Sequence, residues 1–351
     1  MTDRLRLAIV GCGRVVERFH QPALRVSHAW TVVGAVDVRP ARLRWIAGVL
    51  PGVPVAESLA ALPDAGSLDA VLVATPPASH CPLGAEVLRR GAHLLMEKPL
   101  ALQPGEAGSL VALARETRRQ IWVGFNRRFR GGYRTLRRRL GQLPPGRLRS
   151  VEFDLHTDPR RWDAVTRSNA EPEQRGGLLD DLASHQLDLV PWLLQRPVEA
   201  VRARYLRREP AATVVEIGLR FSGGIEARCR SGHGTRQAEH LVVDLGDRAL
   251  VASPGGLVSA PPAMVGAAQR WLTARASADA VRRRLSGRGK ATLETIRQQH
   301  DEWAAALRGS SPATAADGLA GARCLALTEA ARHSLAGGGA WVSAPADEDA
   351  A

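Results

Sequence analysis

The sequence predicts a two-domain α/β protein, in which a parallel sheet covered by helices on both faces precedes an α+β domain with a mostly antiparallel sheet. In about the first 125 residues, continuous apolar strands alternate with helical patterns, as in sheets buried on both faces. From residue 198 to residue 251, strands alternate apolar and polar residues between turn glycines, which indicates an antiparallel sheet with one solvated face. The 351 residues give each domain enough chain for its own core.

The expected boundaries follow this change of pattern. We place the first domain at residues 1–125 and the second at residues 126–340. The last helix, residues 315–335, has the alternative of packing back on the first domain. The polar, acidic tail at residues 344–351 is expected to be disordered.

Charge and composition limit the partners. The formal net charge is +13, but the arginines are spread along the whole chain, aromatic residues are 4%, and no helix-turn-helix or zinc-finger spacing occurs. We therefore expect no nucleic-acid partner, although the positive field favours an anionic substrate or cofactor.

Two further patterns bear on location and metals. No apolar run reaches about 18 residues and no signal-peptide pattern opens the chain, so we expect a cytoplasmic protein without a membrane partner. The cysteines are scattered, without a C-x-x-C pair or a Cys/His cluster, which predicts neither a disulfide framework nor a metal site; they are Cys12, Cys81, Cys229 and Cys324.

The first strand, residues 5–10, leads into a glycine-rich turn and a helical pattern. Gly11 permits the tight turn, and Gly13 lets backbone approach a pyrophosphate at the positive end of the following helix. Val16 stands where the third glycine of the G-x-G-x-x-G fingerprint belongs, so the motif by itself is weak evidence.

Asp37 closes the next strand, residues 31–36, and strengthens the nucleotide-binding interpretation. Its carboxylate suits ribose hydroxyls and repels a 2'-phosphate, which favours NAD. Arg39 and Arg42 are the alternative, because they suit the 2'-phosphate of NADP. A second alternative makes Asp37 a helix N-cap before Pro40.

The remaining strands of the first half are expected at residues 53–55, 69–74, 92–96 and 121–125, with helices from Ser79 as N-cap to Arg90 and from Gln103 to Arg119. Ligands of such sheets lie beyond the carboxyl ends of the strands. Gly11, Asp37, Thr75 and Lys98 all occupy such ends.

Lys98 ends the apolar run 94–100 at the tip of a strand, and lysine occurs elsewhere only at position 290. An ammonium is a compact donor with a movable pKa, which suits proton transfer and carbonyl polarisation. The alternative is a strand-end lysine whose stem covers apolar surface.

The second half begins with a helix at residues 133–140 and a strand at residues 148–155. Further strands are predicted at residues 213–221, 224–230 and 240–245, and helices at residues 264–285 and 291–308.

Residues 176–193 form an apolar helical pattern that carries ionisable residues. On an α-helix Asp181 and His185 share a face, as do Asp181 and Asp188. A carboxylate one turn from an imidazole can orient it for acid/base work. A surface Asp/His pair is the alternative, weakened by the leucines around it.

These motifs together resemble the Gfo/Idh/MocA family, named after glucose-fructose oxidoreductase, inositol dehydrogenase and rhizopine catabolism proteins. The resemblance covers most of residues 5–194 and the final helix. In family order, the matching segments are Gly11–Arg14, Ala74–His80, Glu97–Pro99, Val123–Phe129 and Gly176–Asp188. Glu-Lys-Pro with the Asp/His helix is specific as a pair, whereas Val16 and Pro77 depart from the pattern and concern cofactor geometry.

The resemblance implies an N-terminal Rossmann domain, a C-terminal α+β domain with an open-faced sheet for substrate and oligomer contacts, and a dimer or tetramer. Lys98, Asp181 and His185 match the family's catalytic residues. NAD, or alternatively NADP, is the implied cofactor. The implied cofactor-binding residues are Gly11, Gly13, Arg14, Val15, Asp37, Arg39, Ala74, Thr75, Pro76, His80, Glu97 and Lys98.

The implied reaction is hydride transfer between nicotinamide and a secondary alcohol or ketone of a sugar, cyclitol or nucleotide-linked sugar. His185 exchanges the hydroxyl proton, Lys98 hydrogen-bonds the same oxygen and Asp181 orients the substrate or the imidazole. Candidate substrate contacts are Asn126, Arg127, Arg161 and Trp162, with a solvent-exposed basic loop as the alternative for the last two. An NAD-dependent glycosidase and a non-catalytic sensor are the alternative functions.

Overall fold

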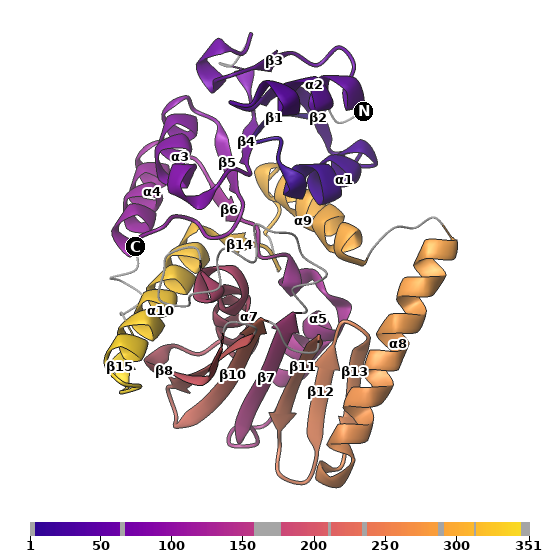
Figure 1. The fold of residues 1–351 in the computed structure, drawn as a ribbon, viewed down its shortest axis with the longest axis vertical. Coiled ribbons are helices and arrows are strands. Elements are labelled where there is room, and N and C mark those ends of the chain that lie inside the picture. The colour runs from indigo at the N-terminus through magenta and orange to yellow at the C-terminus, as the bar shows by residue number, and fades with distance from the viewer. Residues whose placement is uncertain are drawn as a thin grey trace. The chain divides into compact units, whose positions relative to one another are not determined.

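The computed structural model describes residues 4–63, 67–157, 177–209, 212–233, 237–286, 291–311 and 314–344. The chain forms two compact units (Figure 1). The first comprises the described residues within 1–129 and 289–322, and the second those within 130–288 and 323–350. Arg161, Trp162 and residues 345–351 of the tail lie outside the described residues.

A parallel sheet with one antiparallel edge strand forms the centre of the first unit. In the described residues its order is β14-β6-β5-β4-β1-β2-β3, and β14 pairs antiparallel with β6. The strands are β1 (Leu5–Val10), β2 (Trp30–Val36), β3 (Val55–Ala56), β4 (Ala70–Val73), β5 (His93–Met96), β6 (Ile121–Val123) and β14 (Ala316–Asp317). All of β4 and most of β1 and β5 are buried, as the continuous apolar patterns predict.

Helices of the first unit connect these strands. They are α1 (Gln21–Arg25), α2 (Pro40–Val49), α3 (His80–Arg89), α4 (Pro104–Glu116) and α9 (Ala291–Leu307), together with a π-helical turn (Val16–His20) and 3-10 turns at Leu59–Ala61, Pro77–Ser79 and Asn126–Phe129. Ser79 holds the predicted N-cap position of α3, but its hydroxyl donates to Thr75 Oγ1 and Pro76 O. The predicted N-cap position is confirmed, but the Ser79 side chain makes no capping hydrogen bond to α3.

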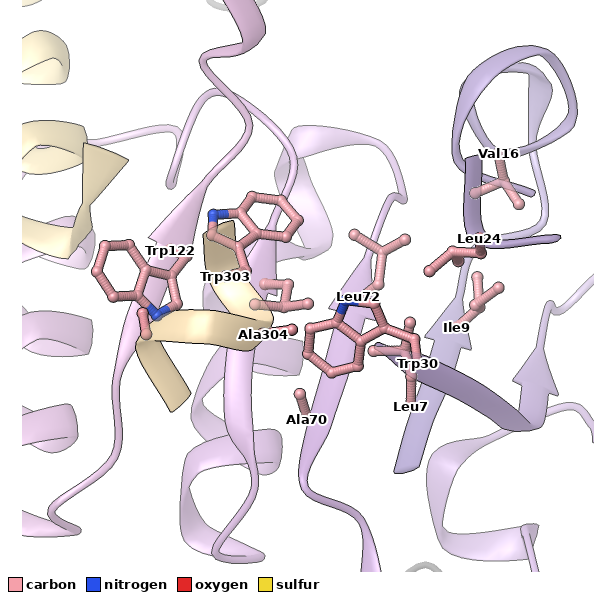
Figure 2. Packing of buried hydrophobic residues seen from close by; sticks show 12 residues of the cluster. Leu7, Ile9, Val16, Leu24, Trp30, Ala70, Leu72, Trp122, Trp303 and Ala304 are labelled. Carbon is pink, nitrogen blue, oxygen red and sulfur yellow. The ribbon is translucent and has the colours of Figure 1, made fainter. Parts of the chain in front are cut away.

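Helix α9 belongs to the first unit, although it lies within the region 126–340 that we expected to form the second domain. Trp303 and Ala304 of α9 join the core that contains Leu7, Leu72 and Trp30 (Figure 2). Figure 1 shows α9 beside α1, with which it is in contact. The physical reason is burial, since Trp303 is fully buried in a cluster whose other members, apart from residues near it in the chain, come from the first 122 residues.

The second unit is built on a mixed sheet. Its order in the described residues is β13-β12-β11-β7-β10-β9-β8-β15, and every neighbouring pair is antiparallel except β7 with β10. The strands are β7 (Ser150–Thr157), β8 (Val198–Glu209), β9 (Ala212–Phe221), β10 (Ile225–His233), β11 (Ala238–Asp244), β12 (Ala249–Ser253), β13 (Gly256–Ala260) and β15 (Val342–Ser343). The predicted fold class is confirmed.

The helices of the second unit include α5 (Gly131–Leu140), α7 (Ser184–Leu194) and α8 (Val265–Leu285). A π-helical turn (Leu179–Ala183) precedes α7, and α10 (Gly318–Ala336) begins in the first unit. Helix α8 runs along β12 and β13 (Figure 1), where Leu272 packs with Val251. Among the helices of the described chain, we find none with the length and apolar content that crossing a membrane requires.

Candidate functional site

The glycine turn after β1 contains two glycines in different environments. Gly11 has a φ of +90°, and a Cβ there would lie 2.7 Å from Ala74 O. A Cβ on Gly13 would have Arg39 Nη2, 3.8 Å away, as its nearest neighbour. Gly11 is therefore required by its positive φ and by the close approach of Ala74. Gly13 leaves open space beside the backbone, as binding of a pyrophosphate requires.

Val16 and its neighbours explain the missing third glycine. The Val16 side chain is fully buried in the core with Leu24. The segment Val16–His20 is π-helical rather than α-helical. The Val16 side chain thus packs in the core where a third glycine would let the helix lie close to the strand. The turn before it keeps the two glycines that let the backbone approach a phosphate.

Asp37 ends β2 and is 5% exposed. Its Oδ2 accepts from Cys12 N at 2.8 Å, and its Oδ1 accepts from Arg39 N at 2.9 Å. Burial opposes ionisation, but the hydrogen bonds from Arg39 and Cys12 outweigh it and lower the pKa of Asp37. The N-cap of α2 is Arg39, so the alternative in which Asp37 caps this helix is wrong.

The two arginines that could favour NADP are both engaged. Arg39 Nε lies 3.1 Å from Asp37 Oδ1, while the Arg39 side chain stays 61% exposed. Arg42 Nε donates to Cys12 O at 2.5 Å, and its Nη2 pairs with Glu17 at 3.0 Å. Arg42 thereby braces the glycine turn, and Arg39 partly neutralises Asp37.

His80 links two loops at the same edge of the sheet. The fully buried ring places Nδ1 2.7 Å from Pro99 O and Nε2 2.9 Å from Thr75 O. Burial lowers the pKa of His80, although both carbonyls favour its charged form. The segment after β4, with Ala74, Thr75 and Pro76, is thus tied to the residues that follow Lys98.

Lys98 lies two residues after the end of β5 and is half-buried. Its backbone N–H donates to Glu97 Oε2 at 3.1 Å, and Glu97 Oε1 lies 2.9 Å from His20 Nε2. His20 was not predicted from the sequence. The one sequence feature that could have indicated it is a histidine at the end of the helical segment that follows the glycine turn.

The first unit therefore brings together most of the predicted cofactor-binding residues and Lys98. They come from the ends of β1, β2, β4 and β5. Arg14 and Val15 are exposed on the glycine turn. Asn126 and Arg127 lie half-buried in the 3-10 turn after β6.

The second unit contains the Asp/His helix, with one departure from prediction. Asp181 lies in the π-helical turn, and α7 begins at Ser184, so the α-helical spacing assumed for Asp181 and His185 is wrong. The neighbouring Asp180 in the same turn is buried and paired with Arg332 at 2.8 Å. This ion pair fixes Asp180 and leaves Asp181 40% exposed.

His233, at the end of β10, joins this region without having been predicted. Its Nε2 lies 4.0 Å from Asp181 Oδ2, and its Nδ1 lies 2.7 Å from Thr157 Oγ1. Its position at the end of a strand with alternating residues could have indicated a functional histidine, but a histidine with a purely structural role can occupy the same position. Asp181 therefore has an imidazole neighbour from another element.

Helix α7 is fixed to the sheet by Gln186. The buried amide donates to Phe153 O at 2.6 Å and accepts from the Ser231 hydroxyl. Cys324 of α10 donates to Ser184 O at 3.2 Å. These bonds hold the half-buried His185 on a rigid helix.

Among the described residues, no three His, Cys, Asp or Glu side chains gather as metal ligands. The four cysteines are free thiols. Burial, and then Asp37, raise the pKa of Cys12 to about 12, so its thiol stays protonated beside the glycine turn.

Comparison with known proteins agrees with both units. The model described as "Oxidoreductase family, NAD-binding Rossmann fold" matches residues 5–125, and the "GFO/IDH/MocA C-terminal domain" matches residues 133–250. Inositol 2-dehydrogenase of Leifsonia xyli is 29% identical over 286 residues, which are 79% of this chain and 78% of that protein.

Two further relatives have the same relationship. Myo-inositol dehydrogenase Hyg17 of Streptomyces leeuwenhoekii is 33% identical over 204 residues, so the match spans 57% of this chain and 58% of Hyg17. The crystal structure of the WlbA dehydrogenase of Bordetella pertussis, in complex with NADH and UDP-GlcNAcA, has the same fold, with a TM-score of 0.78, 23% identity and 99% coverage of both chains. The chain belongs to the Gfo/Idh/MocA family of oxidoreductases, and its first unit is the family's NAD-binding Rossmann domain.

Proposed function

We propose that this protein is an NAD-dependent dehydrogenase that acts on a secondary alcohol or ketone of a sugar, cyclitol or nucleotide-linked sugar. The observation that carries the proposal is one edge of the first sheet, where the open space at Gly13, Asp37 with its lowered pKa and the half-buried Lys98 lie after the carboxyl ends of β1, β2 and β5. Inositol dehydrogenases among the relatives, and the complex of WlbA with UDP-GlcNAcA, support the substrate class.

The residues of the first unit fit NAD. The space at Gly13 suits a pyrophosphate, and the buried Asp37 suits ribose hydroxyls. When bound, the nicotinamide supplies the hydride chemistry. We prefer NAD over NADP because the negative charge of Asp37 opposes a 2'-phosphate, while Arg39 is paired with that same carboxylate.

Three side chains supply the proton chemistry in this proposal. His185 takes the hydroxyl proton during oxidation and returns it during reduction. Lys98 hydrogen-bonds the same oxygen and stabilises the developing alkoxide. Asp181 orients the substrate or an imidazole. The His233 imidazole lies near it, with Nε2 4.0 Å from Asp181 Oδ2. Asn126, Arg127, Arg161 and Trp162 stay candidates for substrate contacts.

The test begins with titration of the protein with NADH and NADPH, followed by absorbance at 340 nm across cyclitols, aldoses and nucleotide-linked ketosugars. We expect tighter binding of NADH and a substrate-dependent absorbance change. Asp37→Ser should narrow the preference for NADH by removing the opposing charge, and Arg39→Ala should not. Binding without turnover of any of these substrates would favour a glycosidase or a sensor instead.

We also infer that the protein works in the cytoplasm as a homo-oligomer. Four free thiols are consistent with a reducing compartment. The family resemblance is the ground for the oligomer; exposed ion pairs on the second sheet, such as Glu226 with Arg220 at 3.2 Å, would set the orientation of a second copy more than its affinity. Light scattering after size-exclusion chromatography tests the oligomer, and a monomeric mass would contradict it.

A further inference from the structure

A chain of hydrogen bonds through two buried histidines and the half-buried Glu97 runs from helix α9 to Lys98 within the first unit. His300 Nε2 lies 2.9 Å from His20 Nδ1, and His20 Nε2 lies 2.9 Å from Glu97 Oε1. Both imidazoles are fully buried, and the Glu97 side chain is 14% exposed. Glu97 Oε2 then accepts the backbone N–H of Lys98 at 3.1 Å.

The partners determine where the protons lie. A carboxylate only accepts, so His20 Nε2 donates to Glu97. A neutral His20 then offers a lone pair at Nδ1, and His300 Nε2 must donate to it. His300 Nδ1 is left as a bare lone pair, and within the described chain this atom has no hydrogen-bond partner. The reverse order would leave a buried N–H unpaired, which costs more.

The surroundings of His300 keep it neutral. Burial, reinforced by His20, lowers the pKa of His300 well below its usual value. Its ring packs edge-on against Trp303 and Trp30, with distances between ring centroids of 5.1 Å and 6.5 Å. Trp30 Nε1 donates to His300 O at 2.9 Å. The chain of hydrogen bonds therefore ends among apolar groups at His300. Among the residues that the structure describes, no group bonds His300 Nδ1 to carry a proton onward, so we assign the hydrogen-bond chain an orienting role and not a proton-transfer role.

Gly124 lies close to the Glu97 carboxylate. A Cβ on Gly124 would lie 2.9 Å from Glu97 Oε1 and 3.0 Å from the carboxyl carbon. Gly124 N also donates to Met96 O at 2.8 Å, which fixes this backbone at the end of β6. The Glu97 carboxylate thus lies close to both the Gly124 backbone and the His20 ring, and a side chain at position 124 would collide with it.

We propose that His20 is a positioning residue for Lys98. His300 fixes the tautomer and ring orientation of His20, His20 fixes the Glu97 carboxylate, and this carboxylate holds the backbone of Lys98. His20 ends the π-helical turn that follows the glycine turn, so the chain also ties the dinucleotide loop to the strand that carries Lys98. The catalytic consequence rests on the proposed dehydrogenase function, but the hydrogen-bond order does not.

The direct test is nitrogen-15 NMR of histidine in the full-length protein, with His20→Gln and His300→Phe used for assignment. We expect His20 and His300 to be neutral with the proton on Nε2. A proton on His20 Nδ1, or a charged His300 at pH 7, would overturn the arrangement. This readout needs no substrate, so it stands even if the proposed reaction is wrong.

The second test is the exchange rate of the Lys98 amide and the steady-state kinetics of three variants. His20→Phe keeps the buried ring but removes the bond to Glu97; we expect faster Lys98 exchange and a roughly tenfold to hundredfold loss of kcat with little change in KM for NAD. His20→Gln keeps an N–H donor and should recover most of the loss. His93→Gln, at the opposite end of β5, is the matched control and should leave kcat unchanged.

Two results would refute the role. One is a folded His20→Phe protein whose kcat and Lys98 exchange match those of the wild type. The other is a His20→Gln protein as impaired as His20→Phe, which would indicate a packing role alone. If His20→Phe fails to fold, the Gln variant and the tautomers still decide the question.

Discussion

Neighbouring residues of the same type have different roles here, because their surroundings differ. Gly11 and Gly13 are both turn glycines in the sequence, yet one faces its own backbone and the other faces open space. Asp180 and Asp181 are adjacent acids, yet one is buried against Arg332 and the other is half-exposed near His233. Residue type and spacing identify the candidates, and contacts assign their roles.

The two glycines give a matched prediction. Gly13→Ala should leave the unfolding free energy nearly unchanged and weaken NADH binding at least tenfold, because the new methyl occupies space that the pyrophosphate needs. Gly11→Ala should instead destabilise the protein, since it strains a φ of +90° and meets Ala74 O. Urea unfolding and fluorescence titration measure the two effects. Equal NADH affinity in Gly13→Ala would contradict the assignment.

Lys98 gives a prediction for catalysis. Lys98→Ala should lower kcat on the order of a hundredfold or more, because the ammonium stabilises charge that develops in the transition state. NADH affinity should change much less. Lys98→Arg is the control that keeps the charge but changes the donor geometry, and it should also be impaired. Turnover of Lys98→Ala within a few-fold of the wild type would rule out this role.

Elements are positioned by a few buried polar contacts in addition to apolar packing. The helical pattern of residues 176–193 predicts a helix there, and α7 confirms an α-helix from Ser184 onward. The π-helical turn before it contains Asp180, which pairs with Arg332, 152 residues further along the chain. The local sequence pattern carries no information about a contact between residues so far apart in the chain.

Gln186 provides the prediction at this scale. Gln186→Leu should lower the unfolding free energy by about 2 kcal/mol, because Phe153 O and the Ser231 hydroxyl lose a buried partner. Turnover should fall with it if α7 carries His185 in place. Gln142→Leu, at an exposed position on another element, is the control and should have little effect. A neutral result at Gln186 would show that apolar contacts alone hold α7.

The whole molecule should lose stability in mild acid, because His80 and His300 are buried and burial lowers the pKa of both. Such a histidine binds a proton on unfolding, so the unfolding free energy falls as the pH drops below about 6.5, the unfolded-state pKa. His300→Phe should reduce the slope by up to about 1.4 kcal/mol per pH unit between pH 6.5 and 5.5.

Urea unfolding at these two pH values measures that slope. His28→Gln, at an exposed histidine of the same unit, serves as the control. An unchanged slope in His300→Phe would mean that His300 is already protonated in the folded protein.

The fold class and the main strands of both sheets could be predicted from the sequence, and Gly11, Asp37 and Lys98 were predicted as candidates for a nucleotide-binding edge. These features rest on local signals: strand and helix periodicity, turn glycines, and polar residues at strand ends. The tertiary structure alone decided that α9 joins the first core and that His300 meets His20 across 280 residues of chain. It also placed His233 near Asp181. The reason is that these contacts come from burial of distant segments against one another, and no periodic pattern encodes which distant residues meet.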